Sequence, residues 1–230
     1  MSYMTLRFAN LDERWLYYRH EFDPSSVREV LGDWNQFAII IGKRTRIYLQ
    51  QYKHIYHRVI KLNCKIDDLR DKLLQYLPEA VYYIRRQNEI LLDFDPEKVH
   101  TCKYLKKWDF CPYLFEELKK HVYKMYEILE NAGYDPEIRF SGRGFHIVLF
   151  TDKVIETKNF LLDVIDNYKL AVDPIVMYKR LARLPYSLNS LTTRIVTPIS
   201  IDDLETFSLD DDRIIPKFLR CKDDRRSGDG

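Results

Sequence analysis

Residues 89–96 constrain the fold of this chain most strongly, because an apolar run there ends in two carboxylates. The sequence is Glu-Ile-Leu-Leu-Asp-Phe-Asp-Pro, which predicts a buried strand. Side chains at positions i and i+2 of a strand share a face, so Asp93 and Asp95 project together and Phe94 points the other way. Neighbouring carboxylates repel each other unless a cation neutralises them, and their oxygens suit Mg²⁺ or Mn²⁺. A solvated strand end or an Asp-Pro turn is the alternative.

The composition is typical of a globular protein with a full hydrophobic core. Of the 230 residues, 46% are apolar and 31% are charged. The net charge of +2 is too small to indicate nucleic-acid binding by itself, so a phosphate-binding surface has to be local. The chain has four cysteines, no apolar run of about 18 residues and no signal-peptide pattern. We therefore expect an intracellular protein of the cytoplasm or nucleoid.

The apolar periodicity predicts an α/β (α+β) fold, with a mixed sheet and helices packed outside it. Helical patterns cover residues 11–20, 67–77, 112–131 and 156–168. Strand patterns cover residues 37–41, 80–85, 89–95, 137–140, 145–150 and 194–201. We expect residues 80–85 and 89–95 to pair as a hairpin. Residues 1–220 are predicted to form a single domain, and residues 221–230 a disordered tail.

A second informative stretch lies between two predicted strands and reads Ser-Gly-Arg-Gly-Phe-His at residues 141–146. Small residues allow backbone amides to approach an anion. Arg143 offers a fork of donors for phosphate, and His146 can hydrogen-bond a phosphate oxygen. A glycine hairpin turn with an incidental arginine is the alternative.

A third carboxylate, Asp173, precedes a stretch that contains Arg180, Arg183, Ser187 and Asn189. Alone, Asp173 followed by proline is equally a turn. Three separated carboxylates together with phosphate-directed donors predict metal-dependent phosphoryl or nucleotidyl transfer. The carboxylates alone are also consistent with a metal-dependent nuclease.

These motifs, in this order, resemble the catalytic small subunit of archaeal and eukaryotic DNA primases, in the archaeo-eukaryotic primase superfamily. The matching runs are Asp-Phe-Asp, Ser-Gly-Arg-Gly-Phe-His and Val-Asp followed by Arg-Leu-Ala-Arg-Leu-Pro-Tyr-Ser-Leu-Asn. Further similarity at residues 17–19, 36–39, 197–199 and 215–216 extends the resemblance over nearly the whole chain. It implies a primase catalytic core, without a large helical insertion because only residues 147–172 separate the last two motifs.

The resemblance also implies roles for individual residues. Asp93, Asp95 and Asp173 would hold two divalent ions, Mg²⁺ or Mn²⁺, about 3.5 to 4 Å apart, which activate a 3′-hydroxyl and stabilise the leaving pyrophosphate. The implied nucleotide-binding residues are Ser141, Gly142, Arg143, Gly144, His146, Arg180, Arg183, Ser187 and Asn189. The implied activity is DNA-directed synthesis of short primers from nucleoside triphosphates on a single-stranded template in DNA replication. The implied partner is a large primase subunit that carries an iron-sulfur domain.

Two departures from the family pattern are evident. Asn189 stands where the family has a histidine, and no Lys-Thr-Gly or Lys-Ser-Gly follows. The alternatives are a weaker affinity for triphosphate and substitution by another cation such as Arg194. The family's Cys-Pro-x-Cys keeps only Cys111 here, which with His100 and Cys102 leaves a tetrahedral Zn²⁺ site one ligand short. The alternatives are a degenerate zinc knuckle, completed by His121 only if its helix packs back, and a disulfide between the two cysteines.

Two further functional hypotheses remain open from the sequence. One is a primase-polymerase or repair polymerase that extends existing primers. The other is a non-catalytic, primase-like scaffold that binds single strands.

Overall fold

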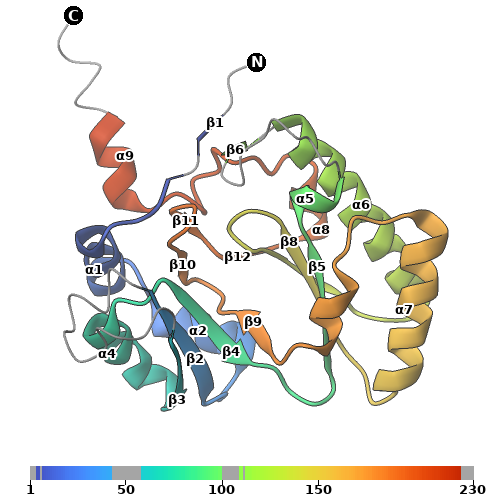
Figure 1. Ribbon diagram of the computed structural model, residues 1–230, viewed down its shortest axis with the longest axis horizontal. Helices are drawn as coiled ribbons and strands as arrows, with labels where there is room; N and C mark the ends of the chain where they lie inside the picture. The colour runs from blue at the N-terminus through green and yellow to red at the C-terminus, as the bar shows by residue number, and fades with distance from the viewer. Residues whose placement is uncertain (1–3, 6, 43–57, 100–108, 111, 224–230) are drawn as a thin grey trace, which may run out of the picture. The chain divides into compact units, whose positions relative to one another are not determined.

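The computed structural model describes residues 4–5, 7–42, 58–99, 109–110 and 112–223 (Figure 1). The chain divides into two compact units. Unit 1 consists of Met1–Leu6, Arg85–Arg180 and Pro198–Ser208. Unit 2 consists of Arg7–Ile84, Leu181–Thr197 and Leu209–Gly230. Each unit is thus assembled from segments that lie far apart in the sequence.

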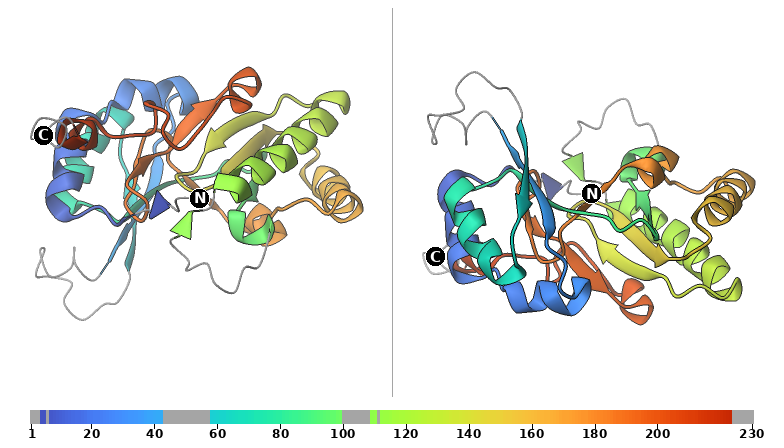
Figure 2. Two further views of the ribbon diagram at one scale, coloured as in Figure 1. Left: turned by 90° about the horizontal axis from the view of Figure 1, so that it is seen from above. Right: turned by 90° about the horizontal axis from the view of Figure 1, so that it is seen from below.

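Unit 1 is built on a sheet with the strand order β12-β7-β8-β5. Its strands are β5 (Glu89–Phe94), β7 (Glu137–Phe140), β8 (Phe145–Phe150) and β12 (Thr197–Ile199). The longer helices are α6 (Pro112–Asn131) and α7 (Val154–Tyr168), and α6 lies alongside the strands in Figure 2. The shorter elements are α5 (Pro96–Val99), η1 (Pro174–Tyr178), α8 (Ile201–Leu204) and the pair β1 (Met4–Thr5) and β6 (Asp109–Phe110).

An aromatic cluster joins α6 to the sheet of unit 1. Phe115 of α6 stacks on Phe145 of β8 with ring centroids 5.1 Å apart, and Phe207 lies 5.3 Å from Phe140 of β7. All four side chains are buried. The Lys119 ammonium, also buried, donates to the Phe207 carbonyl at 3.0 Å and so ties the segment after α8 to α6. This core covers one face of the sheet.

Unit 2 is built on a sheet with the strand order β3-β2-β4-β9. Its strands are β2 (Gln36–Ile41), β3 (Arg58–Asn63), β4 (Ala80–Ile84) and β9 (Leu181–Arg183). A small antiparallel pair joins β10 (Leu188–Asn189) to β11 (Arg194–Ile195). The helices are α1 (Leu11–His20), α2 (Pro24–Leu31), α4 (Ile66–Tyr76) and α9 (Lys217–Asp223). A capping box at Asn10 and an Asp23 cap start α1 and α2.

The predicted α/β fold class is confirmed, and the strand pairs with a described register are antiparallel. The predicted hairpin between residues 80–85 and 89–95 is wrong, because β4 pairs with β2 and β9 whereas β5 pairs with β8. The connecting residue Arg85 bonds elsewhere: its amide donates to the Arg180 carbonyl at 2.8 Å and its guanidinium to the Val176 carbonyl at 3.1 Å. The segment between β4 and β5 is therefore hydrogen-bonded to η1 and to Arg180.

Helix α9 reaches Asp223, within the predicted tail, and residues 224–230 lie outside the described part of the chain. The single domain over residues 1–220 and the disorder of the tail stay predictions. None of the helices among the described residues combines the length and apolar character that crossing a membrane requires.

Candidate active site

Strand β5 carries Asp93 at its end, and Asp95 follows directly after the strand. Residues Ile90, Leu91 and Leu92 are almost fully buried, which anchors the strand in the core. Phe94 is fully buried on the opposite face, whereas the side chains of Asp93 and Asp95 are each 28% exposed. The alternation predicted from the sequence is therefore observed.

A row of polar side chains crosses the sheet at Asp93. On β8, His146 lies directly opposite Asp93, with 3.5 Å between the imidazole Nε2 and the carboxylate Oδ1. On the other side, Phe94 forms a bridge with Val172, and the Asp173 amide donates to the Asp93 carbonyl at 2.9 Å. Opposed residues of antiparallel strands share a face, with Cβ atoms about 4.5 to 5.5 Å apart. The backbone thus places Asp93 and Asp173 opposite each other, and Asp95 follows directly beyond the end of β5.

The carboxylates are nevertheless engaged with protein groups. Asp95 pairs with Arg143, and Asp173 Oδ1 accepts the Ile175 amide at 3.2 Å as the N-cap of η1. Among the described residues, no three His, Cys, Asp or Glu side chains lie close enough together to hold a metal ion as they stand. Carboxylate oxygens suit Mg²⁺ or Mn²⁺ in chemistry, but a shared ion would require these side chains to exchange their present partners and move closer together.

Residues 141–144 form the tight turn between β7 and β8. The Ser141 amide donates to the Gly144 carbonyl at 2.9 Å, and the Gly144 amide donates to Ser141 Oγ at 3.2 Å. Gly142 has a φ of 98°, which side-chain-bearing residues rarely adopt. A Cβ on Gly144 would lie 2.0 Å from the Phe94 carbonyl oxygen. Both glycines are therefore required by the backbone, and Gly144 allows the turn to pass directly over the acidic strand.

Arg143 projects from this turn towards two carboxylates. It pairs with Asp95, and its Nη1 lies 2.9 Å from Glu97 Oε1. Burial opposes the charged form of Arg143, but the two carboxylates outweigh it and raise the pKa of the guanidinium. The predicted phosphate-binding arginine thus sits beside the acids, held by a residue, Glu97, that the sequence interpretation did not include.

A second residue missed from the sequence is Arg139, which lies opposite His146 on β7. It is only 1% exposed and pairs with Glu137 at 2.6 Å. The row across the sheet therefore reads Asp173, Asp93, His146, Arg139. The sequence gives only a weak indication that Arg139 belongs to the site, because arginine side chains on strands are more often exposed to solvent.

The other predicted nucleotide-binding residues are divided between the units. Arg180 is exposed at the end of the main segment of unit 1. Arg183, in unit 2, lies over the Tyr82 ring at 4.8 Å. Ser187 is buried and donates to the Leu184 carbonyl at 2.7 Å. Their roles in nucleotide binding stay predictions.

Asn189 and Arg194, which pair across β10 and β11 in unit 2, are both largely buried. Asn189 Oδ1 accepts the Leu191 amide at 3.2 Å. Burial lowers the pKa of Arg194, with Asp210 opposing and Arg7 reinforcing that shift. The Asn189 side chain therefore bonds to the backbone of its own turn. The substitution of Arg194 for the missing family cation stays a prediction.

The predicted zinc ligands His100, Cys102 and Cys111 lie outside the described residues. Neither the degenerate knuckle nor the disulfide is tested. His121, on α6, is half-buried, and burial lowers its pKa against an opposing effect of Glu117.

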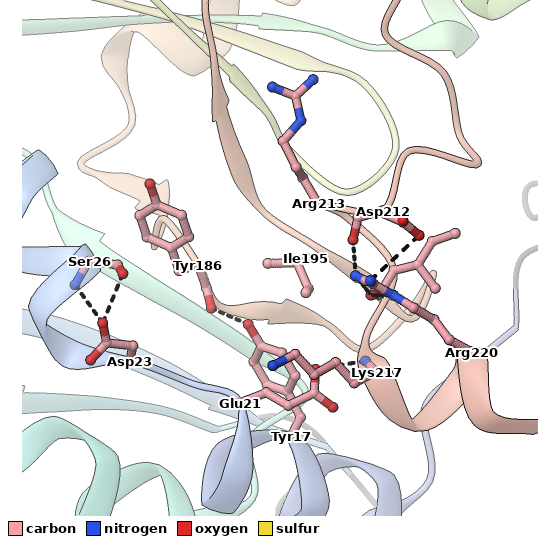
Figure 3. A pocket seen from close by; sticks show the side chains of 11 residues that line it. Tyr17, Glu21, Asp23, Ser26, Tyr186, Ile195, Asp212, Arg213, Lys217 and Arg220 are labelled. Atoms are coloured by element: carbon pink, nitrogen blue, oxygen red, sulfur yellow. Dashed lines mark hydrogen bonds and ion pairs between the residues drawn. The ribbon is translucent and has the colours of Figure 1, made fainter.

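Unit 2 contains a pocket of about 200 Å³, shown in Figure 3. It is lined by residues of α1, α2, α9 and nearby loops, among them Tyr17, Glu21, Asp23, Tyr186, Asp212 and Arg220. The Tyr17 hydroxyl donates to the Tyr186 carbonyl at 2.6 Å, and Glu21 accepts the Lys217 amide at 2.8 Å. Its polar groups thus tie the elements of unit 2 together.

Comparison with known proteins identifies the family. No family model matches the chain. The chain is 33% identical to an uncharacterized DNA primase small subunit-like protein of Archaeoglobus fulgidus, in an alignment 270 positions long that covers 96% of this chain and 95% of that protein. The chain belongs to the DNA primase small subunit-like family.

A solved structure shares the fold of this chain. The polymerase domain of Mycobacterium tuberculosis ligase D, in complex with DNA, has a TM-score of 0.59 to this structure. The alignment covers 100% of this chain and 96% of that domain, with 11% sequence identity. At that identity the likeness concerns the fold alone, and it confirms the α/β fold class.

Proposed function

We propose that the chain is a primase-type nucleotidyltransferase that joins nucleoside triphosphates into short primers on a single-stranded DNA template. The observation that supports this proposal is that Asp93 lies between His146 and Asp173, while Asp95 pairs with Arg143 of the Ser141–Gly144 turn. Family membership supports it. We infer that both units serve one catalytic domain.

In this proposal the three aspartates hold two Mg²⁺ or Mn²⁺ ions. When bound, the ions would lower the pKa of the attacking hydroxyl and neutralise the leaving pyrophosphate. Asp95 would have to release Arg143 to take part. Released from Asp95, Arg143 can donate to a phosphate beside the amides of the turn, and His146 can donate to the same group.

The remaining proposed contacts to the nucleotide carry less positive charge than the family pattern, because Asn189 stands where the family has a histidine. Arg180 and Arg183 supply positive charge, whereas Ser187 and Asn189 supply neutral donors. The proposed partners are single-stranded DNA, nucleoside triphosphates and a large primase subunit with an iron-sulfur domain. A structural Zn²⁺ would involve His100, Cys102 and Cys111.

The test is synthesis by the full-length chain with Mn²⁺, labelled nucleotides and an unprimed single-stranded template. We expect primers from the native protein and none from an Asp93→Asn, Asp95→Asn double variant of equal melting temperature. Product from a primed template alone would indicate a primer-extending polymerase. Metal-independent DNA binding without metal-dependent nucleotide binding in calorimetry would indicate a non-catalytic scaffold and contradict the proposal.

A further inference from the structure

Two exposed aromatic rings in unit 1 are each covered by a cation. The Lys158 ammonium on α7 lies 4.7 Å from the centroid of the Tyr178 ring, at the end of η1. The Arg86 guanidinium lies 5.7 Å from the centroid of the Phe150 ring, at the end of β8. Tyr178 is 61% exposed and Phe150 is 39% exposed, so much of each ring's surface is open to solvent.

Arg85 connects these two pairs. It precedes Arg86 in the chain, and its guanidinium donates to the carbonyls of Val176 and Met177 in η1, at 3.1 and 3.3 Å. Arg85 is also close enough to Lys158 to lower its pKa, in addition to the larger effect of burial. Arg85 therefore ties the segment that carries Arg86 to η1, which ends at Tyr178, and the two pairs lie on neighbouring segments of unit 1.

We call this the basic-aromatic surface, and it consists of Arg86, Phe150, Lys158, Tyr178 and the exposed Lys179. The carboxylate of Glu89, which accepts the Arg86 amide at 3.2 Å, is buried beneath it. Cations interleaved with exposed rings complement a single nucleic-acid strand, because phosphates attract the cations and every base has a face that stacks on an aromatic ring.

The basic-aromatic surface also lies close to Asp173, at one end of the row of polar side chains that crosses the sheet. Asp173 caps η1 and Tyr178 ends it. With a rise of about 2 Å per residue in such a helix, Tyr178 lies about 10 Å from Asp173. At about 3.4 Å per stacked nucleotide, a strand leaving the acids reaches the ring after roughly three nucleotides.

We propose that the basic-aromatic surface binds the single-stranded nucleic acid, with one base stacked on Tyr178 and phosphates at Lys158, Lys179 and Arg86. The inference rests on the proposed function in taking Asp173 as part of the reacting centre. Val176 and Met177 are buried and bound by Arg85, so η1 keeps its conformation without the Tyr178 ring.

The test measures binding of a fluorescent oligothymidylate to the full-length chain by anisotropy, in EDTA and without nucleotides. We expect Tyr178→Ala to weaken binding about tenfold, because it removes one stacking platform, and Tyr178→Phe to bind like the native protein. An unchanged Kd for Tyr178→Ala would overturn the proposal. Equal losses in Tyr178→Ala and Tyr178→Phe would overturn it too, since the ring would then not be the contact.

A matched control is available in the same unit. Tyr168 is 53% exposed, with the Lys124 ammonium 5.4 Å from its ring centroid, but Lys124 is also 3.8 Å from Glu127. We expect Tyr168→Ala to leave the Kd unchanged. A loss equal to that of Tyr178→Ala would overturn the assignment to this particular surface.

The salt dependence tests the phosphate contact separately. Lys158→Ala should reduce the slope of log K against log salt by about one, whereas Lys124→Ala should leave it unchanged. Equal slopes for Lys158→Ala and the native chain would overturn the phosphate contact. Binding does not require catalysis, so an inactive protein whose binding is weakened by Tyr178→Ala would contradict the proposed function and support this surface.

Discussion

Asp93 occupies the middle of the polar row, with His146 opposite on β8 and Asp173 beside it across a backbone hydrogen bond. The His146 imidazole faces the Asp93 carboxylate, whereas the Asp173 carboxylate accepts a backbone amide. Asp173 also caps η1, so a substitution there can affect both structure and chemistry. Separating these effects requires a variant that keeps the cap.

Asp173→Asn is that variant. The asparagine Oδ1 can still accept the Ile175 amide, so we expect the melting temperature to stay within a few degrees of the native value. The lost negative charge should remove most primer synthesis, by about 100-fold or more. Thermal unfolding and synthesis assays on the same preparation check this. A clearly lowered melting temperature would assign Asp173 a structural role.

Arg143→Gln should affect metal and nucleotide in opposite directions. The arginine neutralises Asp95, so its removal should strengthen binding of Mn²⁺ alone by about threefold or more. The same change should weaken triphosphate binding about tenfold, because a charged donor is lost. Manganese titration by electron paramagnetic resonance and calorimetry with nucleotide measure the two effects.

Arg86→Gln serves as the control for this charge change, since Arg86 contacts Phe150 rather than Asp95. Weaker Mn²⁺ binding in Arg143→Gln would contradict the competition between arginine and metal.

At the residue scale, the sequence predicted the opposite orientations of Asp93 and Phe94 from strand geometry and the turn at residues 141–144 from its glycines, whereas the catalytic roles of the acids stay predictions. Glu97 and Arg139 were missed because their importance comes from partners on other strands or turns. The internal contact of Asn189 was likewise not predictable from local sequence.

Among the elements, β5, β7 and β8 were predicted nearly to the residue, as were α1 and α6. The apolar period of α6 is regular, and glycine or proline marks several ends of these elements. The pairing of β4 was predicted wrongly, because sequence proximity favoured a hairpin and the bonds of Arg85 to η1 are non-local. Element positions follow from local chemistry, whereas strand partners depend on the whole chain.

The turn between β7 and β8 offers a prediction at the element scale. Gly144→Ala would place a methyl group against the Phe94 carbonyl, so we expect a loss of about 3 kcal/mol or more in the free energy of unfolding. At Gly133 a Cβ meets nothing within 4 Å, and only the φ of 83° resists alanine, at about 1 to 2 kcal/mol. Urea unfolding measures the free energy of unfolding of Gly144→Ala and Gly133→Ala. Equal decreases in the two variants would contradict the predicted clash at Gly144.

For the whole molecule, the segment Pro198–Ser208 should be indispensable to unit 1. It supplies most of β12 and the Phe207 ring of the aromatic cluster. We therefore expect residues 85–180 alone to unfold in urea without a sharp transition. Fusing residues 198–208 to that fragment through a glycine-serine linker should restore cooperativity. A cooperative transition in the shorter fragment would show that the segment is dispensable.

The segments of the two units alternate along the sequence, which affects folding during translation. The strand β9 that completes the sheet of unit 2 arrives at residues Leu181–Arg183, and β12 of unit 1 only at Thr197–Ile199. Until these strands emerge from the ribosome, their partners β4 and β7 each expose an unpaired edge on which another nascent chain could add a strand. Slow, late folding and a need for chaperone protection during translation follow from this order.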